Sequence, residues 1–510
     1  MGDETFSEDV GVSTTQSTRD SPIGTMPPEL LAEVFSHCAS VEPFSPVQLS
    51  HVSMLWRETA ITTPSLWHTL SARIPSQTPE ICLAKINTWL ARSGAFPLHV
   101  SLILTEWQDD DNTTFWSSMI SLRDRSIHWS RLTVIAASYT IACQFFHVFV
   151  SVPGHAPLYR IDLRVGSPLV EEFDDEEPLL ALNTPEDEVE CITTVFAYLS
   201  WIYAPRFTEF NLGTSALPNS SWLSLVDLGF TRLRSLRIFE RKGMDGQIGA
   251  SSLLGFLEKC PALEKFIFKG SSLFDPLGTS ASVVELSHLR ELHLAQTCHQ
   301  RAILAHLCTP ALEVLRLSWL NRPEMFIDES YVPDPSEQNE EPVEWSQSQF
   351  TDLLTGAGIR SLISCSNPPI RILDMDFADA RSPKDFVWMF EHLPTLESFR
   401  IVGSDMSNKV LYALASKNQS GKWLCPRLTS LDFSRCDVIT GKGVVALAMG
   451  RNPCVDVEGE VTRDVSAGEP RPARLTKFVI EVCAGVDCES IGVMQHLIGD
   501  VDYEVEVVPL

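Results

Sequence analysis

A repeated pattern of apolar residues constrains this chain more than any other feature of its sequence. The pattern is L-x-x-L-x-L, in which Leu, Ile, Phe or Met occupies each anchor position. Clear copies begin at Leu233, Leu263, Leu289, Leu312, Ile370, Leu396 and Leu428, and weaker copies begin at Leu132, Leu158, Phe207 and Leu475. Alternating anchors of this kind indicate a short β-strand with one buried face.

The spacing between the copies indicates the architecture. Neighbouring copies are most often about 26 residues apart, and helix-like apolar stretches such as 252–259 and 443–448 lie between them. A period of about 20–29 residues with this consensus is typical of leucine-rich repeats. Because one repeat cannot bury its apolar face alone, repeats stack, with a parallel β-sheet on the concave side and helices on the convex side. We therefore predict an α/β solenoid over residues 73–510.

Acidic residues are concentrated in a few short stretches. The 510-residue chain has a net charge of −27, and residues 171–190 and 324–344 contain ten and eight carboxylates without any Lys or Arg. We expect acidic loop insertions at 166–190 and 322–349, and a disordered acidic tail at 1–22. The remaining body is close to neutral. Binding to nucleic acid or to a membrane, which needs clustered cations, is therefore not expected.

Residues 23–72 differ in character from the repeats and read as three short helical elements. Pro27 and Pro28 suit the first turn of a helix. Apolar residues then follow one face of the first element (Leu30, Leu31, Val34, Phe35 and Cys38) and of the second (Leu49, Val52, Trp56 and Ala60), before a third begins at Leu66 and Trp67. So small a unit has a marginal core by itself. Either the repeats or a partner must cover its remaining apolar surface.

Three segments of this unit resemble an F-box, in the F-box-like form common in fungal proteins. They are residues 27–38 (PPELLAEVFSHC), 49–57 (LSHVSMLWR) and 63–67 (TPSLW). The resemblance implies that the unit binds a Skp-type adaptor and that the repeats select a target protein, as in the substrate receptor of an SCF-type cullin–RING ubiquitin ligase. Such a receptor raises the effective concentration of its target near the ubiquitin-loaded enzyme.

The resemblance also assigns roles to individual residues. It implies that the following residues contact the adaptor or support the contact surface: Pro27, Leu30, Leu31, Val34, Phe35, Val52, Trp56, Leu66 and Trp67. Some of them, above all Trp56 and Trp67, are equally consistent with an internal core. A second interpretation therefore stays open, in which the helices only cap the solenoid of an interaction scaffold outside the ubiquitin system.

One outward-facing position recurs between the second and third anchors of the repeats. Along the predicted sheet it reads Asn211, Arg237, Ile267, His293, Arg316, Asp374, Arg400 and Asp432. We hypothesise that Arg237, His293, Arg316 and Arg400 make part of the concave face basic, so that it accepts an acidic or phosphorylated target segment. The alternative is that the acidic loops fold over this row, or that the row is merely solvated.

Catalytic, metal and cofactor sites are not expected. Phosphate-binding, dinucleotide-binding, nucleophile-elbow and metalloprotease motifs are missing from the sequence, and the group His293, Cys298, His299, His306 and Cys308 lacks the spacing of a zinc site. The 13 cysteines contain no C-x-x-C pair, and the N-terminus has no signal-peptide pattern. These features favour reduced thiols in the cytoplasm or nucleus. Residues 132–159 carry no charge over a membrane-spanning length, but they read as strand, helix, turn and strand.

Overall fold

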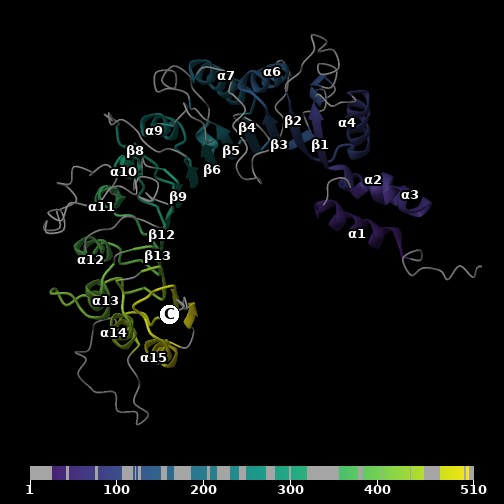
Figure 1. Ribbon diagram of the computed structural model, residues 1–510. Helices are drawn as coiled ribbons and strands as arrows, with labels where there is room; N and C mark the ends of the chain where they lie inside the picture. The colour runs from purple at the N-terminus through teal and green to yellow at the C-terminus, as the bar shows by residue number, and fades with distance from the viewer. Residues whose placement is uncertain are drawn as a thin grey trace, which may run out of the picture.

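A parallel sheet of 14 strands runs through this protein in a computed structural model (Figure 1). The structure describes residues 26–41, 45–74, 79–105, 119–120, 122–123, 128–150, 158–165, 185–203, 207–214, 217, 230–240, 248–270, 282–297, 300–318, 355–376, 383–404, 406–436, 438–452, 471–498 and 501–504. The strands follow one another across the sheet in sequence order. Helices lie along the outer side of the curved sheet, so the strands line its concave side (Figure 1).

The strands of this sheet are β1 (Thr69–Ile74), β2 (Leu98–Leu104), β3 (Trp129–Ala136), β4 (Arg160–Val165), β5 (Glu209–Thr214), β6 (Ser235–Glu240), β7 (Lys265–Lys269), β9 (Glu291–Ala295), β11 (Val314–Ser318), β12 (Ile372–Asp376), β13 (Ser398–Val402), β14 (Ser430–Ser434), β15 (Lys477–Glu481) and β16 (Val501–Glu504). Two short strands, β8 (Val284–Glu285) and β10 (Leu307–Cys308), pair separately.

The helices on the convex side are α4 (Pro79–Ser93), α6 (Tyr139–Val150), α7 (Pro185–Tyr203), α9 (Ala250–Glu258), α10 (Gln300–Ala305), α11 (Thr355–Ser366), α12 (Pro383–Glu391), α13 (Asn408–Ala415), α14 (Gly441–Arg451) and α15 (Cys488–Ile498). A 3₁₀ turn, η4 (Phe230–Arg232), precedes β6. The mixed α/β class and the long parallel sheet agree with the solenoid predicted from the repeat spacing.

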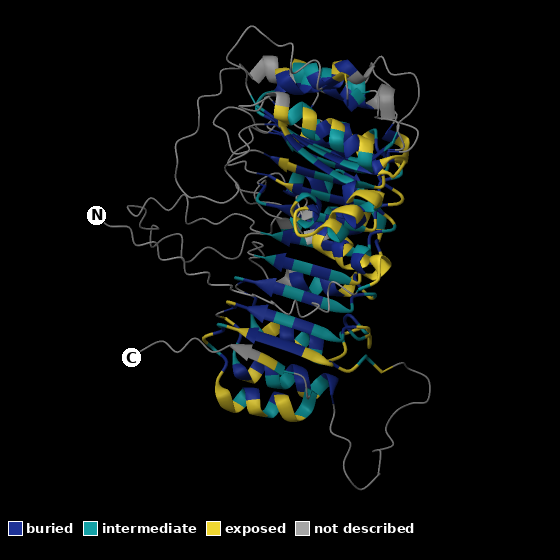
Figure 2. Ribbon diagram, turned by 90° about the vertical axis from the view of Figure 1, so that its right-hand side faces the viewer, coloured by how far each residue is buried: buried dark blue, intermediate teal, exposed yellow. Residues whose placement is uncertain are grey.

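Every copy of the L-x-x-L-x-L pattern forms a strand, from β3 to β7, in β9, and from β11 to β15. The anchors point inward and are buried in every copy but the first, and most residues between them stay at least partly accessible (Figure 2). In β3 the pattern starts at Trp129 and not at Leu132 as predicted, because Leu132 and Val134 pair with the anchors Ile161 and Leu163 of β4. Equivalent anchors lie opposite one another on neighbouring strands, as Leu236, Phe266 and Leu292 do. The result is one continuous apolar core along the solenoid.

The pattern did not identify β1, β2 and β16. In β1 the small residue Ala72 occupies a buried position between Leu70 and Ile74. In β2 the β-branched residue Val100 does the same between Leu98 and Leu102. Both residues fit the inner face of a strand, but neither belongs to the set of anchor types in the pattern.

The N-terminal helices lie beside β1 at one end of the arc (Figure 1). They are α1 (Pro28–Val41), α2 (Ser45–Ser50), α3 (Met54–Thr62) and the 3₁₀ turn η2 (Pro64–Trp67). The sequence placed the end of this unit at residue 72, but the first strand of the sheet already begins at Thr69. Alternate residues of β1 bury into the solenoid core, so the helical unit ends at Trp67.

Two other expectations concern charged and uncharged stretches. The strand, helix and strand predicted in the charge-free stretch 132–159 are β3, α6 and the approach to β4, and no helix within the described ranges is long and apolar enough to cross a membrane. Of the predicted acidic insertion 166–190, residues 185–190 begin α7 instead, since a proline followed by acidic residues suits a helix N-terminus. Residues 1–22, 166–184 and 322–349 lie outside the described residues.

A buried cation holds the C-terminal repeats together. Arg451, at the end of α14, is 1% exposed, and its guanidinium donates hydrogen bonds to three backbone carbonyls. Nε donates to Leu414 at 2.9 Å, Nη1 donates to Cys425 at 3.1 Å, and Nη2 donates to Leu424. Burial lowers the pKa of Arg451 to about 10, which leaves the side chain charged at neutral pH.

Candidate interaction surfaces

The first helix, α1, has two apolar faces rather than one. Leu31 and Phe35 are buried, whereas Leu30 and Val34 are 52% and 46% exposed. Residues four apart share a face of a helix and adjacent residues do not, so the predicted stripe divides into an inner and an outer row. Pro27, which precedes the helix, is also exposed, and its carbonyl accepts a hydrogen bond from the Leu31 amide at 3.1 Å.

The inner row belongs to a compact aromatic core. Phe35 packs against Trp56, which is half-buried, with 4.9 Å between the ring centroids. Trp67 is fully buried and donates a hydrogen bond from Nε1 to the carbonyl of Ala60 at 2.7 Å. The ring of Trp67 also meets Trp89 of α4 edge-on, at 4.9 Å between centroids. These contacts join the N-terminal helices to the first repeat.

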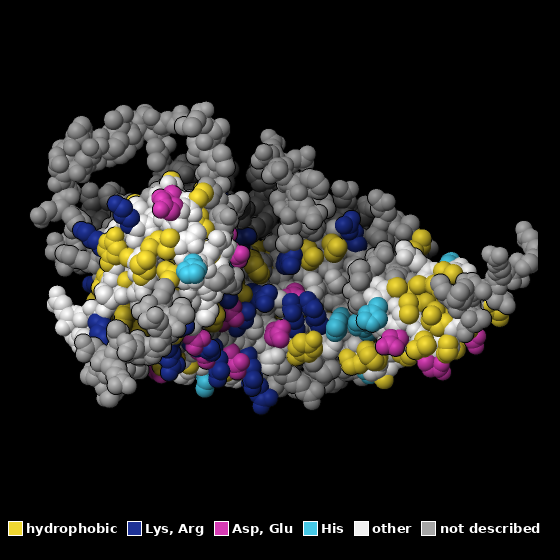
Figure 3. Space-filling view, turned by 90° about the horizontal axis from the view of Figure 1, so that it is seen from below, with side chains coloured by type: hydrophobic (Ala, Val, Ile, Leu, Met, Phe, Trp, Pro, Cys, Tyr) yellow, Lys and Arg dark blue, Asp and Glu magenta, His cyan; other side chains and the backbone are white. Residues whose placement is uncertain are grey.

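The residues proposed for adaptor contact therefore fall into two groups. Leu31, Phe35, Leu66 and Trp67 are buried within the chain, so they do not lie on its surface. Leu30, Val34 and Val52 lie on the surface, with Val52 61% exposed. A residue that sequence analysis did not select, Met54 at the start of α3, is the most exposed at 83%. Figure 3 shows hydrophobic side chains gathered over this end of the molecule.

The concave face carries the row of residues predicted from the repeats. Backbone pairing places Asn211 beside Arg237, Arg237 beside Ile267, and so on through His293, Arg316, Asp374, Arg400 and Asp432. The predicted register is thus confirmed at every position. Lys and Arg side chains gather in the middle of the molecule in Figure 3, with carboxylates among them.

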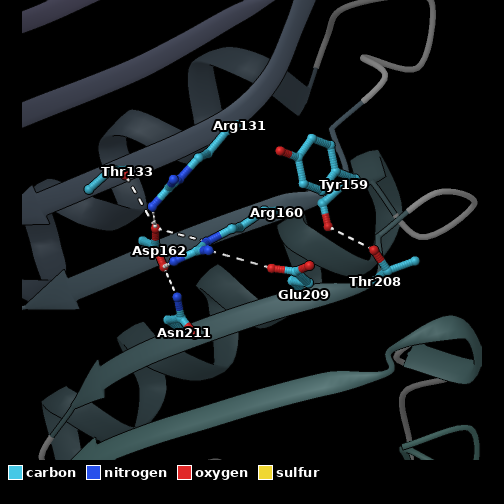
Figure 4. A network of polar contacts seen from close by, with 8 residues as sticks. All are labelled: Arg131, Thr133, Tyr159, Arg160, Asp162, Thr208, Glu209 and Asn211. Atoms are coloured by element: carbon cyan, nitrogen blue, oxygen red, sulfur yellow. Dashed lines mark hydrogen bonds and ion pairs between the residues drawn. The ribbon is translucent and has the colours of Figure 1, made fainter. Parts of the chain in front are cut away.

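At the N-terminal part of this face, Asp162 of β4 is the centre of a polar network (Figure 4). Its carboxylate pairs with Arg131 at 3.0 Å and with Arg160 at 3.3 Å, and it accepts a hydrogen bond from the amide of Asn211. Burial by itself raises the pKa of Asp162, but the Asn211 hydrogen bond and the two arginines lower it below its ordinary value overall. Arg160 also pairs with Glu209 at 3.5 Å, so both arginines are neutralised.

A second network spans β7, β9, β11 and β12. Glu291 pairs with Lys265 at 2.6 Å and with Arg316 at 2.7 Å, and Arg316 also pairs with Asp374 at 2.9 Å. His293 lies between these groups and shares a hydrogen bond of 3.0 Å with the hydroxyl of Ser318. Burial and the nearby Arg316 lower the pKa of His293, which favours its neutral form.

The positive charge expected along the row is therefore largely cancelled. Arg316 is held by two carboxylates, and Arg400 pairs with Asp432 at 3.2 Å. Two of these acids, Asp374 and Asp432, belong to the row itself and lie directly beside Arg316 and Arg400. The third, Glu291, lies one row away, so the row by itself does not reveal it. Arg237 differs, because within the described ranges no hydrogen bond or ion pair engages its side chain. The same holds for Lys269 of β7, which sequence analysis missed because it lies one row further along.

A third charge pattern also escaped sequence analysis, although its signal is local. The residue after the first anchor alternates between Arg and Glu in six successive repeats: Arg234, Glu264, Arg290, Glu313, Arg371 and Glu397. Neighbours in this ladder face each other across the sheet, with ion pairs of 3.5 Å between Arg234 and Glu264 and 2.8 Å between Arg371 and Glu397. Exposed pairs of this kind contribute little individually. Alternation does prevent like charges from facing each other.

Metal ligation finds no geometric support in the described part of the chain, where no group of three or more His, Cys, Asp or Glu side chains is placed to hold an ion. Of the cysteine and histidine group considered above, Cys298 and His299 lie outside the described residues. His306, which directly follows α10, instead contacts the carbonyl of Ala302 in that helix at 2.8 Å.

Comparison with known proteins agrees with the repeat architecture. The family model described as Leucine Rich repeat matches residues 425–448, which include β14 and the start of α14. No curated protein matches the chain. Among solved structures, the chain is similar to one described as "Crystal structure of Rad7 and Elc1 complex in yeast", with 12% identity, a TM-score of 0.33, and coverage of 95% of this chain and 90% of that chain.

A second solved structure with similarity is described as "Crystal structure of TLR13-ssRNA13 complex". It has 11% identity and a TM-score of 0.25, and the match covers 87% of this chain and 62% of that chain. The fold defines a solenoid of strand-and-helix repeats around one long parallel sheet, and its segment 425–448 matches a leucine-rich repeat.

Proposed function

We propose that this protein is the substrate receptor of an SCF-type cullin–RING ubiquitin ligase. The N-terminal helices bind a Skp-type adaptor through the outer apolar row, which we define as Leu30, Val34, Val52 and Met54. The repeats hold a target protein on their concave face. In this role the chain catalyses no reaction itself, and it acts by keeping the target close to the ubiquitin-loaded enzyme.

The observation that supports the proposal is the exposure of the outer apolar row. The helical unit already buries Leu31, Phe35 and Trp67 in its own core, so the exposed apolar side chains are not needed to complete that core. Several large apolar side chains exposed on one small helical unit are characteristic of a protein interaction site. The resemblance of the same helices to an F-box supports a Skp-type adaptor as the partner.

One observation also supports the capping interpretation. Trp67 contacts Trp89, and the indole of Trp89 donates a hydrogen bond to the Thr69 carbonyl at 3.0 Å, so the helices cover the first strand and its helix. A terminal cap of this kind is what a solenoid requires. Capping, however, uses only the inner side of the helices. It gives no reason for the outer apolar row, which is why we favour adaptor binding.

Co-purification with a Skp-type adaptor tests the proposal. The full-length chain should capture the adaptor, and the double variant Leu30→Asp/Val34→Asp should lose at least about tenfold in affinity, because charge is placed in an apolar contact. Since both side chains are exposed, the variant should keep the circular dichroism spectrum and thermal midpoint of the wild type.

A matched control comes from the convex side of the C-terminal repeats. Tyr412 of α13 and Met449 of α14 are 45% and 54% exposed, so Tyr412→Asp/Met449→Asp makes the same kind of change far from the N-terminal helices. This control should capture the adaptor normally. Failure of the wild-type chain to capture it, or equal capture by the Leu30 and Val34 variant, would contradict adaptor binding and favour the scaffold.

A further inference from the structure

We propose that the concave face at β6 and β7 binds an acidic segment of the target protein, in which separate carboxylates lie next to a large apolar side chain. The binding surface consists of Arg237, Phe239, Ile267 and Lys269, and we call it the β6–β7 patch. The inference rests on the proposed function, because it specifies the chemistry of the target that the repeats recruit.

Backbone pairing brings the four residues together. Arg237 lies opposite Ile267, and Phe239 lies opposite Lys269. Because residues two apart on a strand share a face, all four point toward the concave side. The cations therefore occupy one diagonal of the patch and the apolar side chains occupy the other. Lys269 is exposed, and Phe239 is 39% exposed, which is unusual for an aromatic side chain in the middle of a sheet.

The charge of the patch is not balanced by its surroundings. On one side, Asp162 and Glu209 are engaged by Arg131 and Arg160. On the other side, Glu291 is engaged by Lys265 and Arg316. Arg237 and Lys269 lie between these two neutralised networks, with no carboxylate of the described residues bound to either. A partner that places acids here gains two ion pairs and breaks none.

The arrangement favours separate carboxylates over a single phosphate. Strong phosphate sites direct several donors at one group. Here the two cations are on different strands and are offset by two residues, which separates their backbones by about 8 Å. Phe239 and Ile267 fill the other corners of the patch. A peptide with carboxylates on both sides of a Leu or Ile side chain meets both requirements.

Fluorescence anisotropy with synthetic peptides tests this inference on the full-length protein. The probe is a labelled peptide in which Asp and Leu take turns at every second position with Gly between them, so that in an extended peptide their side chains share one face. It is compared with the same peptide carrying Asn for Asp and with a phosphoserine peptide carrying Gly for Leu. We expect the Asp/Leu peptide to bind best. The variant Arg237→Glu/Lys269→Glu should weaken its binding at least about tenfold, and added salt should weaken binding to the wild type.

The matched control is Lys409→Glu/Lys442→Glu, which changes the net charge equally on exposed positions of α13 and α14. The affinity of this control for the Asp/Leu peptide should stay within about twofold of the wild-type value, since these helices lie on the opposite side of the sheet from the patch. Equal binding of the Asn peptide, tighter binding of the phosphoserine peptide, or equal loss in the control would overturn the inference.

Adaptor capture separates the two proposals. The Arg237→Glu/Lys269→Glu variant should retain the adaptor, because the patch is remote from the outer apolar row (Figure 1). Absence of peptide binding together with normal adaptor capture overturns the β6–β7 patch alone. Absence of adaptor capture by the wild type overturns the proposed function, whatever the peptides do.

Discussion

Leu30 and Leu31 are neighbours in the sequence, but they lie on different sides of α1. Leu31 is 1% exposed and packs into the core that continues into the solenoid, whereas Leu30 is 52% exposed. A helix turns by about 100° per residue, so adjacent apolar residues reach different environments. This division separates the structural role of α1 from its proposed binding role, and each role can be tested by itself.

The first prediction contrasts these two leucines. Leu31→Asp should destabilise the N-terminal unit by about 3–5 kcal/mol, since it removes a buried side chain and buries a charge. Leu30→Asp should change its stability by less than about 0.5 kcal/mol. Hydrogen exchange of α1 and α3 measures the difference. Similar exchange in both variants would mean that the two faces of α1 are not distinct.

A second prediction concerns Asp162 and pH. Its pKa is lowered in the folded chain, so its carboxylate stabilises the fold above the unfolded pKa of about 3.9, and the contribution is lost as the pH falls through the folded pKa. Asp162→Asn should therefore destabilise by about 1–3 kcal/mol at neutral pH. Its urea midpoint should approach that of the wild type as the pH is lowered to about 4 and below.

The control for that experiment is Asp432. Burial raises the pKa of its carboxyl, and the partial compensation by Ser434 and Arg400 does not reverse the shift. A raised pKa means that ionisation opposes folding, so stability increases as the pH falls through the folded value. Asp432→Asn should consequently cost little or nothing at neutral pH. If the stability difference between variant and wild type changed with pH in the same direction for both variants, the assigned networks would be contradicted.

A third prediction concerns Arg451. Arg451→Met removes the donors of three buried carbonyls and should destabilise the C-terminal repeats by about 3 kcal/mol or more. Arg451→Lys keeps the charge but cannot reproduce the planar fork of donors, so its loss should be intermediate. The ring of Trp423 lies 5.8 Å from the guanidinium, so its fluorescence reports on this region during unfolding in urea. An unchanged midpoint in the Met variant would rule out the structural role.

Close packing between α13 and α14 gives a fourth prediction. A Cβ added at Gly450 would overlap the backbone carbonyl of Ala415, which cannot move away as a flexible side chain can. Gly450→Ala should therefore destabilise by about 1–3 kcal/mol. A Cβ added at Gly492 in α15 would meet no neighbouring atom, so Gly492→Ala should be neutral or stabilise by up to about 1 kcal/mol. The shift of the thermal midpoint from the wild-type value measures each effect. Shifts of equal size and sign in the two variants would refute the packing argument.

The repeat strands could be predicted from the sequence because their signal is local and repeated. Anchors such as Leu292 and Leu315 recur at a fixed spacing, and the same pattern fixed the register of Arg316 beside His293 and Asp374. The first and last strands were missed because their inward positions use other residue types, such as Ala72, or lie at the edge of the sheet. Their assignment depends on pairing with neighbours, which a local pattern does not contain.

The sequence by itself determined the solenoid, because hydrophobic period and strand length are set by residues close together in the chain. It also determined which residues share the central row of the concave face. Only the tertiary structure decided which charges remain available, since Arg316 also pairs with Glu291 from another row while Arg237 meets no acid in the described chain. It likewise decided which of Leu30 and Leu31 is buried, because burial depends on what packs against a helix and not on the helix alone.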